Sequence, residues 1–138
     1  MTEMKIYLDT NIYIDLFEDR TSNFKPLGEF AHQILKRTFS CEFKIIASPL
    51  ILDELKNNKH LEHGTDLLAD LEKANKLEFV NISYNDKKTA SMPKEGSHYA
   101  DRLHYIIAEK ANADFFITGN WRDFYGLGKI QVLQSEYL

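Results

Sequence analysis

The feature that most constrains this chain is the alternation of short apolar segments, rich in β-branched and aromatic residues, with longer segments of helical periodicity. Each short apolar segment predicts a buried strand, because a strand covered on both faces is apolar along its whole length. Strands that alternate with helices build parallel sheets. We therefore expect an α/β protein whose strands span residues 5–9, 44–47, 77–82, 115–117 and 130–133.

The segments between these strands carry helix start signals. Thr10 and Asn11 are N-cap residue types ahead of a helical apolar pattern, and Ser48-Pro49 combines a cap residue with a proline suited to the first turn. The residues from His60 to Gly64 are expected to connect two helices. We predict helices over about 12–17, 27–39, 49–55, 66–74 and 97–111, a helical turn at 121–125, and no defined structure for the polar segment 83–96.

The chain has 138 residues, with no internal repeat, low-complexity tract or linker. Such a length is typical of one domain with a sizeable core. We therefore expect a single domain over residues 1–138. Its fold is expected to be a three-layer α/β/α sandwich around a mostly parallel sheet of four to five strands.

The charge balance and the cysteine content restrict the functional classes. The chain carries 17 Lys and Arg against 21 Asp and Glu, a net charge of −4. This balance counts mildly against a nucleic-acid partner, unless several acids surround a cation that offsets them. Cys41 is the only cysteine, so no disulfide forms within the chain, and no apolar run reaches membrane length. Both features predict a cytoplasmic protein.

Four acids fall where the predicted strands lead into helices. Asp9 ends the first strand, Glu54 lies in the helix after the second, Asp101 lies in the first turn of the 97–111 helix, and Asp123 follows the fourth strand. Function in open parallel sheets gathers at the carboxyl ends of strands. Carboxylates brought together there repel one another unless a divalent cation binds. Mg²⁺ and Mn²⁺ prefer such oxygen ligands, so we predict a metal site that these four acids form.

Each acid also has an ordinary structural alternative. Asp9 caps a helix well, Asp101 suits the helix dipole, and Asp123 suits a solvated turn. Glu54 competes with its neighbour Asp53. We favour Glu54 because it lies on the side of the helix that carries the buried apolar residues.

Five polar residues near these acids are candidates for supporting the metal or contacting a substrate. Asn11 can steady Asp9, whereas Thr118 and Asn120 follow a buried strand and can bind water or phosphate oxygen. His104 lies one turn after Asp101, and either contacts substrate or fills space. Arg122 can reach a phosphate or pair locally with an acid.

Further candidates for nucleic-acid contacts are aromatic or basic. Trp121 can stack on a base if it is exposed, and otherwise belongs to the core. Lys87, Lys88 and Lys94 lie in the polar segment 83–96, where they either contact an RNA backbone or are simply solvated.

Four ordered segments resemble the motifs of PIN-domain ribonucleases, and the resemblance spans nearly the whole chain, from Lys5 to Leu133. They are Leu8-Asp9-Thr10-Asn11, Ser48-Pro49-Leu50-Ile51-Leu52-Asp53-Glu54-Leu55, Ala100-Asp101-Arg102-Leu103-His104 and Phe116-Ile117-Thr118-Gly119-Asn120-Trp121-Arg122-Asp123-Phe124. The resemblance implies an α/β/α sandwich with Mg²⁺- or Mn²⁺-dependent endonuclease activity on RNA. It also implies a likeness to VapC-type toxins, which pair with an antitoxin and are frequently homodimers.

By this resemblance, Asp9, Glu54 and Asp101 take the first three acidic positions. Many family members carry Asp where Asn120 stands, and others keep a later acid, which here is Asp123. Three functions are therefore compared. We favour a metal-dependent endoribonuclease, with a catalytically weak or inactive PIN-like binding module as the alternative. A phosphatase with Asp9 as nucleophile ranks third, because Asn11 stands where a haloacid-dehalogenase-like enzyme has a second Asp.

Overall fold

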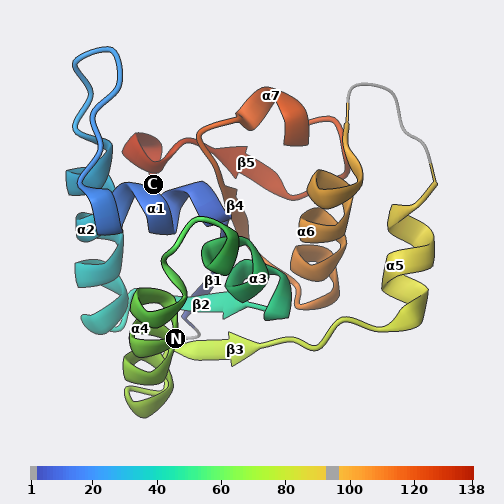
Figure 1. Ribbon diagram of the computed structural model, residues 1–138, viewed down its shortest axis with the longest axis horizontal. Coiled ribbons are helices and arrows are strands. Elements are labelled where there is room, and N and C mark those ends of the chain that lie inside the picture. The colour runs from blue at the N-terminus through green and yellow to red at the C-terminus, as the bar shows by residue number, and fades with distance from the viewer. Residues whose placement is uncertain (1–2, 93–96) are drawn as a thin grey trace.

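The computed structural model, which describes residues 3–92 and 97–138, is built around a five-stranded sheet in which every pairing is parallel (Figure 1). The strand order is β3-β2-β1-β4-β5. The strands are β1 (Met4–Leu8), β2 (Phe43–Ala47), β3 (Leu77–Phe79), β4 (Phe115–Ile117) and β5 (Gln131–Leu133). The predicted α/β class and the parallel sheet are thereby confirmed.

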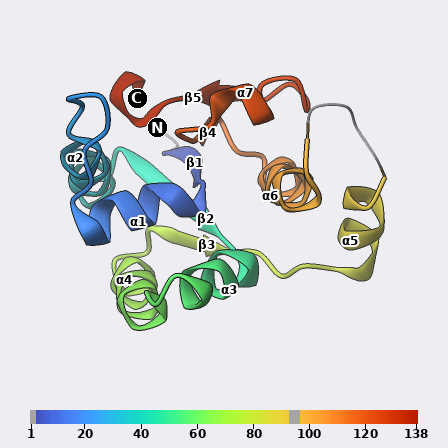
Figure 2. The same cartoon turned by 45° about the horizontal axis from the view of Figure 1, so that its top comes forward.

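Helices cover both faces of this sheet. The connections from β1 to β2 and to β3 run in one direction across the sheet, and the later connections run in the other. Right-handed crossovers therefore place the first four helices on one face and the last two on the opposite face, whereas the fifth helix packs against the outer side of the sixth (Figures 1 and 2). The helices are α1 (Thr10–Glu18), α2 (Leu27–Phe39), α3 (Pro49–Asn57), α4 (Leu61–Lys73), α5 (Tyr84–Ala90), α6 (Tyr99–Lys110) and α7 (Trp121–Phe124), and a 3₁₀ turn, η1, spans Ser135–Tyr137.

The strand order reverses at β1, which has β2 on one side and β4 on the other. Chain connections leave the carboxyl ends of β1 and β4 in opposite directions, which opens a crevice at this edge of the sheet. Backbone pairing between β1 and β4 continues one residue past the end of β1, because the Asp9 N–H donates to the Ile117 carbonyl at 2.9 Å. Asp9 is thus held at the point where ligands bind in folds of this type.

The core is packed from both faces of the central strands. Ile6, Ile45 and Ile46 are fully buried, as expected for strands covered on both sides. On the α6 face, the Phe116 ring stacks on Tyr7 with centroids 5.0 Å apart and contacts Phe124 at 4.5 Å. No helix among the described residues is long and apolar enough to cross a membrane.

Helix α4 begins earlier than its sequence pattern predicts. We expected a connector from His60 to Gly64, whereas the helix starts at Leu61. Gly64 does not break the helix because it lies against Leu55 of α3. A Cβ at Gly64 would stand 2.5 Å from the Leu55 Cδ1 atom, so the glycine permits the close contact between the two helices.

Other differences from the prediction arise from local hydrogen bonds. The N-cap of α1 is Asp9, not Thr10 or Asn11, because the Asp9 side chain accepts from the Thr10 N–H. The polar segment after β3 contains the helix α5, which a capping box between Ser83 and Asp86 initiates. β3 ends at Phe79 rather than at residue 82. Residues 93–96 of the polar segment lie outside the described residues.

Candidate metal centre

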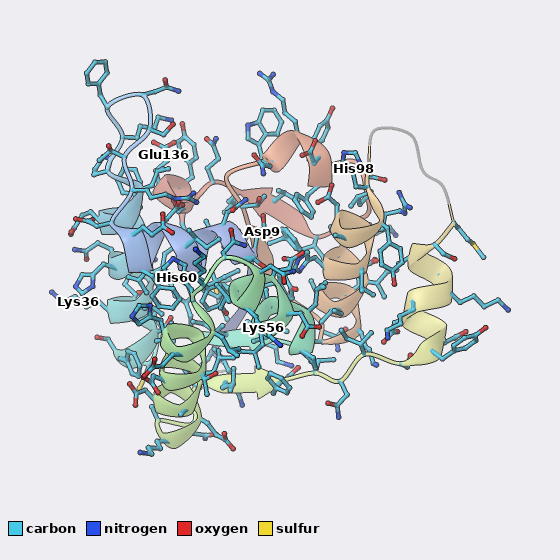
Figure 3. All side chains as sticks on the ribbon, viewed as in Figure 1. Asp9, Lys36, Lys56, His60, His98 and Glu136 are labelled. Atoms are coloured by element: carbon cyan, nitrogen blue, oxygen red, sulfur yellow. The ribbon has the colours of Figure 1, made fainter. Side chains whose placement is uncertain are left out.

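Asp9 is the most enclosed acid of the site, at the step from β1 into α1 (Figure 3). Its side chain is almost fully buried, and both carboxylate oxygens are used. Oδ1 accepts from the Thr10 N–H at 2.8 Å, and Oδ2 accepts from the Thr118 hydroxyl at 2.9 Å. Burial raises the pKa of Asp9, against the opposing effects of His104 and Thr118. The fold therefore holds this carboxyl in a fixed orientation in an environment that disfavours an uncompensated charge.

Glu54 reaches the same place from the second turn of α3. Its Oε1 atom accepts from the Thr10 hydroxyl at 2.5 Å and from His104 Nε2 at 2.7 Å. Burial alone would raise the pKa of Glu54, but His104 and Thr10 outweigh it, so the pKa is lowered. Glu54 is therefore an ionised carboxylate. Glu54 also lines the cavity described below, whereas the neighbouring Asp53 does not.

His104 lies beside both carboxylates although its imidazole is 2% exposed. Nε2 is 2.7 Å from Glu54 Oε1 and 4.0 Å from Asp9 Oδ1, and Nδ1 is 2.5 Å from the Tyr7 hydroxyl. Asp9, Glu54 and His104 each offer one atom, and these three atoms lie within 4.8 Å of one another. This spacing suits the coordination of one cation.

Asp101 contributes from the first turn of α6, one turn before His104. Its Oδ2 atom accepts from the His98 N–H at 3.4 Å, which caps the helix. Burial raises the pKa of Asp101, and the nearby charge of Asp123 raises it further. Asp101 thus performs the ordinary capping role and also faces the cavity that holds Asp9 and Glu54.

These residues line one cavity of about 270 Å³ at the carboxyl edge of the sheet, which we name the edge cavity. It brings together six of the nine residues that the sequence analysis singled out, from three helices, the step from β1 into α1 and the turn after β4. The lining residues are Asp9, Thr10, Asn11, Ile14, Glu54, Asn57, Asn58, Asp101, His104 and Asn120.

The other three predicted residues surround this cavity. Thr118 is fully buried behind it, donates to Asp9 and accepts from the Asn120 N–H at 3.0 Å. Asp123 and Arg122 line an adjoining cavity of about 300 Å³, together with Gly119, Asn120 and Trp121. Asn120 borders both cavities. Asp123 therefore acts on the edge cavity through its charge, and its side chain is not part of the lining.

Sequence reasoning missed the contact of Tyr7 with His104 and the burial of the Ser48 hydroxyl. Tyr7 was assigned only to the buried first strand, and Ser48 only to a helix cap. In the structure the Tyr7 hydroxyl is hydrogen-bonded to His104 Nδ1, and Ser48 is fully buried without a hydrogen-bond partner among the described residues. No local pattern signals these roles, because Tyr7 and His104 are 97 positions apart.

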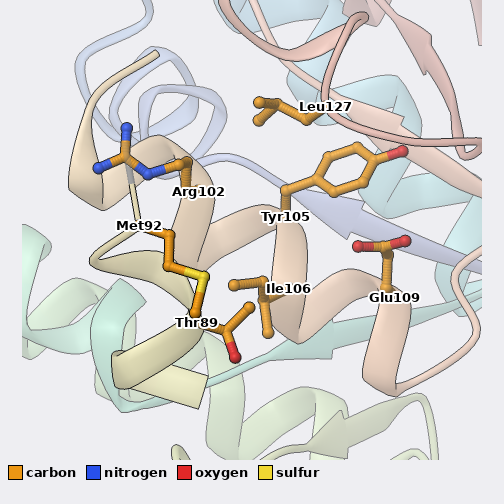
Figure 4. Close-up of a pocket in the computed structure, with 7 residues that line it drawn as sticks. All are labelled: Thr89, Met92, Arg102, Tyr105, Ile106, Glu109 and Leu127. Carbon is orange, nitrogen blue, oxygen red and sulfur yellow. The ribbon is translucent and has the colours of Figure 1, made fainter. Parts of the chain in front are cut away.

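A further cavity of about 290 Å³ lies on the opposite side of α6 from the edge cavity, and Figure 4 shows its lining residues. We name it the apolar pocket, and its lining has no cluster of carboxylates. It is lined by Thr89, Met92, Arg102, Tyr105, Ile106, Glu109 and Leu127.

The chain was compared with known families, curated proteins and solved structures. The model of the PIN domain family matches residues 6–130. The VapBC2 complex of Rickettsia felis, solved with a DNA fragment from its promoter, contains a chain with the same fold. The two chains are 18% identical and superpose with a TM-score of 0.56, over 95% of this chain and 98% of the other. The curated proteins gave no match. Because the family model covers most of the described sheet and all four acidic positions, the chain belongs to the PIN domain family.

Proposed function

We propose that this protein is a metal-dependent endoribonuclease that hydrolyses RNA phosphodiester bonds. PIN domains are generally nucleases. The observation that carries the proposal is the convergence of Asp9, Glu54 and Asp101 on one cavity at the carboxyl edge of the sheet. Such a cavity can hold Mg²⁺ or Mn²⁺, with Asp123 influencing the site from the adjoining cavity.

A bound divalent cation would lower the pKa of a water molecule and offset negative charge on the scissile phosphate. The protein's own contribution is positional. Thr118 and the Thr10 N–H fix the two oxygens of Asp9, and the Thr10 hydroxyl fixes Glu54. Because these carboxylates are held before the metal arrives, binding requires little rearrangement.

The surface next to the edge cavity supports a single-stranded nucleic acid as substrate. Trp121 is 38% exposed, and its ring lies 5.4 Å from that of Tyr125, which is largely exposed. Arg122 lies 5.5 Å from the Trp121 ring centroid, where it can meet a phosphate. Exposed aromatic rings beside a cation bind unpaired bases by stacking.

Basic residues farther away add less to the argument. Lys87 and Lys88 are exposed on α5, and Lys94 lies outside the described residues. The net charge of −4 is partly explained by the acids of the edge cavity, which a cation would offset.

We also propose that the protein is the toxin of a toxin–antitoxin pair and forms a homodimer in the cytoplasm. The likeness to a chain of the VapBC2 complex supports an antitoxin partner. A co-expressed small protein that binds this chain and suppresses its RNA cleavage would support the pairing.

The direct test of the enzymatic proposal is cleavage of a labelled RNA pool with Mn²⁺, Mg²⁺ or EDTA. We expect cleavage with either metal and none in EDTA. Asp9→Asn keeps the size of the side chain and should remove the activity. Cleavage that is unaffected by both EDTA and this substitution would contradict the proposal and indicate a contaminating nuclease.

The second candidate function is a PIN-like binding module without catalysis. Asn120 favours it, since many family members have an acid at this position and an amide binds a cation more weakly. The two functions differ in one experiment. A module that binds RNA in the presence of Mn²⁺ but leaves every phosphodiester bond intact would replace the nuclease as the conclusion.

A further inference from the structure

His104 is unusual among the residues of the edge cavity because it offers nitrogen at a site that is otherwise made of oxygen donors. Its position is not incidental, since three independent elements hold it: β1 through Tyr7, α3 through Glu54, and its own helix α6. Imidazole is uncommon as a fully buried group unless both nitrogens are satisfied.

The tautomer of His104 follows from its partners. A carboxylate oxygen can only accept, so in the hydrogen bond to Glu54 it is Nε2 that carries the proton. Nδ1 of the neutral ring then accepts from the Tyr7 hydroxyl. Coordination through Nε2 requires the opposite arrangement, with the proton on Nδ1.

The surroundings of Tyr7 allow this second arrangement. With a proton on Nδ1, His104 donates to the Tyr7 oxygen, and the Tyr7 hydroxyl needs another acceptor. The Ser48 hydroxyl is fully buried and has no hydrogen-bond partner among the described residues, and Ser48 comes two positions after Ile46, the residue of β2 that pairs with Tyr7. Ser48 therefore supplies the oxygen that accepts from the Tyr7 hydroxyl when His104 Nδ1 donates to Tyr7.

Metal-binding histidines almost always donate their second ring N–H to an oxygen that fixes the ring and its tautomer. The Tyr7 hydroxyl is placed to be that oxygen. Ser48 is placed to accept the hydrogen bond that the Tyr7 hydroxyl donates in turn. The spacing of Asp9, Glu54 and His104 within 4.8 Å leaves His104 Nε2 facing the same point as the two carboxylates.

We propose that His104 Nε2 is a direct ligand of the cation in the edge cavity, and that this nitrogen selects a first-row transition ion over Mg²⁺. The proposal rests on the proposed function only in that the cavity binds a divalent cation. Magnesium prefers oxygen donors and retains its waters, whereas imidazole binds transition ions well. Tyr7 and Ser48 are positioning residues that hold the tautomer which exposes the Nε2 lone pair.

The test is pulsed electron paramagnetic resonance of Mn²⁺ bound to the protein, which detects nitrogen in direct contact with the ion. We expect nitrogen modulation in the wild-type protein, altered when histidine is labelled with ¹⁵N and absent in His104→Gln. Modulation that persists in His104→Gln overturns the proposal, because the chain has four other histidines. Bound Mn²⁺ without nitrogen modulation in the wild type overturns it as well.

Affinity measurements by calorimetry provide a second readout. We expect wild-type protein to bind Mn²⁺ at least about tenfold more tightly than Mg²⁺, and His104→Gln to lose most of that preference. Equal loss of affinity for both ions in His104→Gln would indicate a structural role and overturn the proposal.

Tyr7→Phe examines the positioning chain with the ring packing retained. We expect about a tenfold loss of Mn²⁺ affinity with the nitrogen modulation preserved in the fraction that binds. An unchanged affinity in this variant would remove Tyr7 from the proposal.

The outcomes separate this inference from the proposed nuclease. A protein that cleaves RNA with bound Mn²⁺ but shows no nitrogen modulation keeps its function and loses the His104 ligand. A protein that binds neither ion at millimolar concentration loses both.

Discussion

The edge cavity and the apolar pocket lie on two sides of the same helix, α6, and have nearly the same volume, about 270 and 290 Å³. Asp101 and His104 point from α6 into the first, whereas Tyr105 and Ile106 line the second (Figure 4). The edge cavity is lined by several charged and polar side chains, whereas the surface of the apolar pocket is mostly apolar. The volumes therefore do not distinguish the two cavities, and we favour the edge cavity as the candidate functional site because of the chemistry of its lining.

Two polar side chains of the apolar pocket, those of Arg102 and Tyr105, form hydrogen bonds that hold neighbouring segments of the fold together. The Arg102 guanidinium donates to the carbonyl oxygens of Ala90 and Ser97, which ties α6 to the segments around α5. The Tyr105 hydroxyl accepts from the Ile130 N–H at 2.8 Å. In the edge cavity the corresponding hydrogen bonds orient carboxylates. The same helix thus makes structural contacts on one side and carries the candidate ligands Asp101 and His104 on the other.

The largest effect is expected from Asp9→Asn in the edge cavity. Loss of this carboxylate should reduce metal-dependent RNA cleavage at least about a hundredfold, because a bound metal supplies several kcal/mol of transition-state stabilisation. Initial rates on a labelled RNA with saturating Mn²⁺ measure the effect. A variant that keeps cleavage within a few-fold of wild type would show that the metal, if present, binds elsewhere.

A smaller effect is expected from Trp121→Ala beside the edge cavity. Loss of one base-stacking surface should raise KM for single-stranded RNA about tenfold and leave kcat nearly unchanged. Tyr84→Ala is the matched control, since Tyr84 is an exposed aromatic residue on α5 that lines neither cavity. Equal changes in the two variants would argue against a specific contact at Trp121.

In the metal-free protein, burial of the Asp9 carboxyl should lower the free energy of unfolding at neutral pH. The pKa of Asp9 is raised above its ordinary value of 3.8, so the folded state binds the proton more tightly than the unfolded state does. Stability therefore falls as pH rises through the window between 3.8 and the raised pKa, by about 1.4 kcal/mol for each unit of the rise. Glu54 acts in the opposite sense, because its pKa is lowered.

Asp9→Asn removes this titration. In EDTA near neutral pH, we expect the variant to melt at a higher temperature than wild type, with the difference vanishing toward pH 3.8. Thermal melts followed by circular dichroism measure it. A variant that is less stable than wild type at neutral pH would mean that the carboxylate is better compensated than its burial indicates.

The smallest functional effect is expected from Ile106→Ala in the apolar pocket. Ile106 is half-buried, so its truncation should cost about 1 kcal/mol of unfolding free energy. Mn²⁺ affinity and RNA cleavage should not change, since the substitution leaves the edge cavity intact. Weaker metal binding in this variant would show that the two sides of α6 are coupled.

Much of the fold was predictable from the sequence because its signals are local. Short apolar runs marked all five strands, although the edge strands β3 and β5 are only partly buried, and Ser48-Pro49 marked the start of α3. Boundaries were predicted less well where tertiary contacts override them. The early start of α4 depends on how Gly64 lies against Leu55, and sequence periodicity does not record that contact.

The sequence by itself determined that Asp9, Glu54 and Asp101 would lie at one edge of a parallel sheet, because strand ends and helix starts are encoded within a few residues. Only the tertiary structure decided that His104 lies between Glu54 and Tyr7, and that Asp123 lines the adjoining cavity. These contacts depend on how each helix is rotated about its axis when it packs on the sheet. That rotation is set by side chains 50 to 97 positions apart, which no local pattern relates to one another.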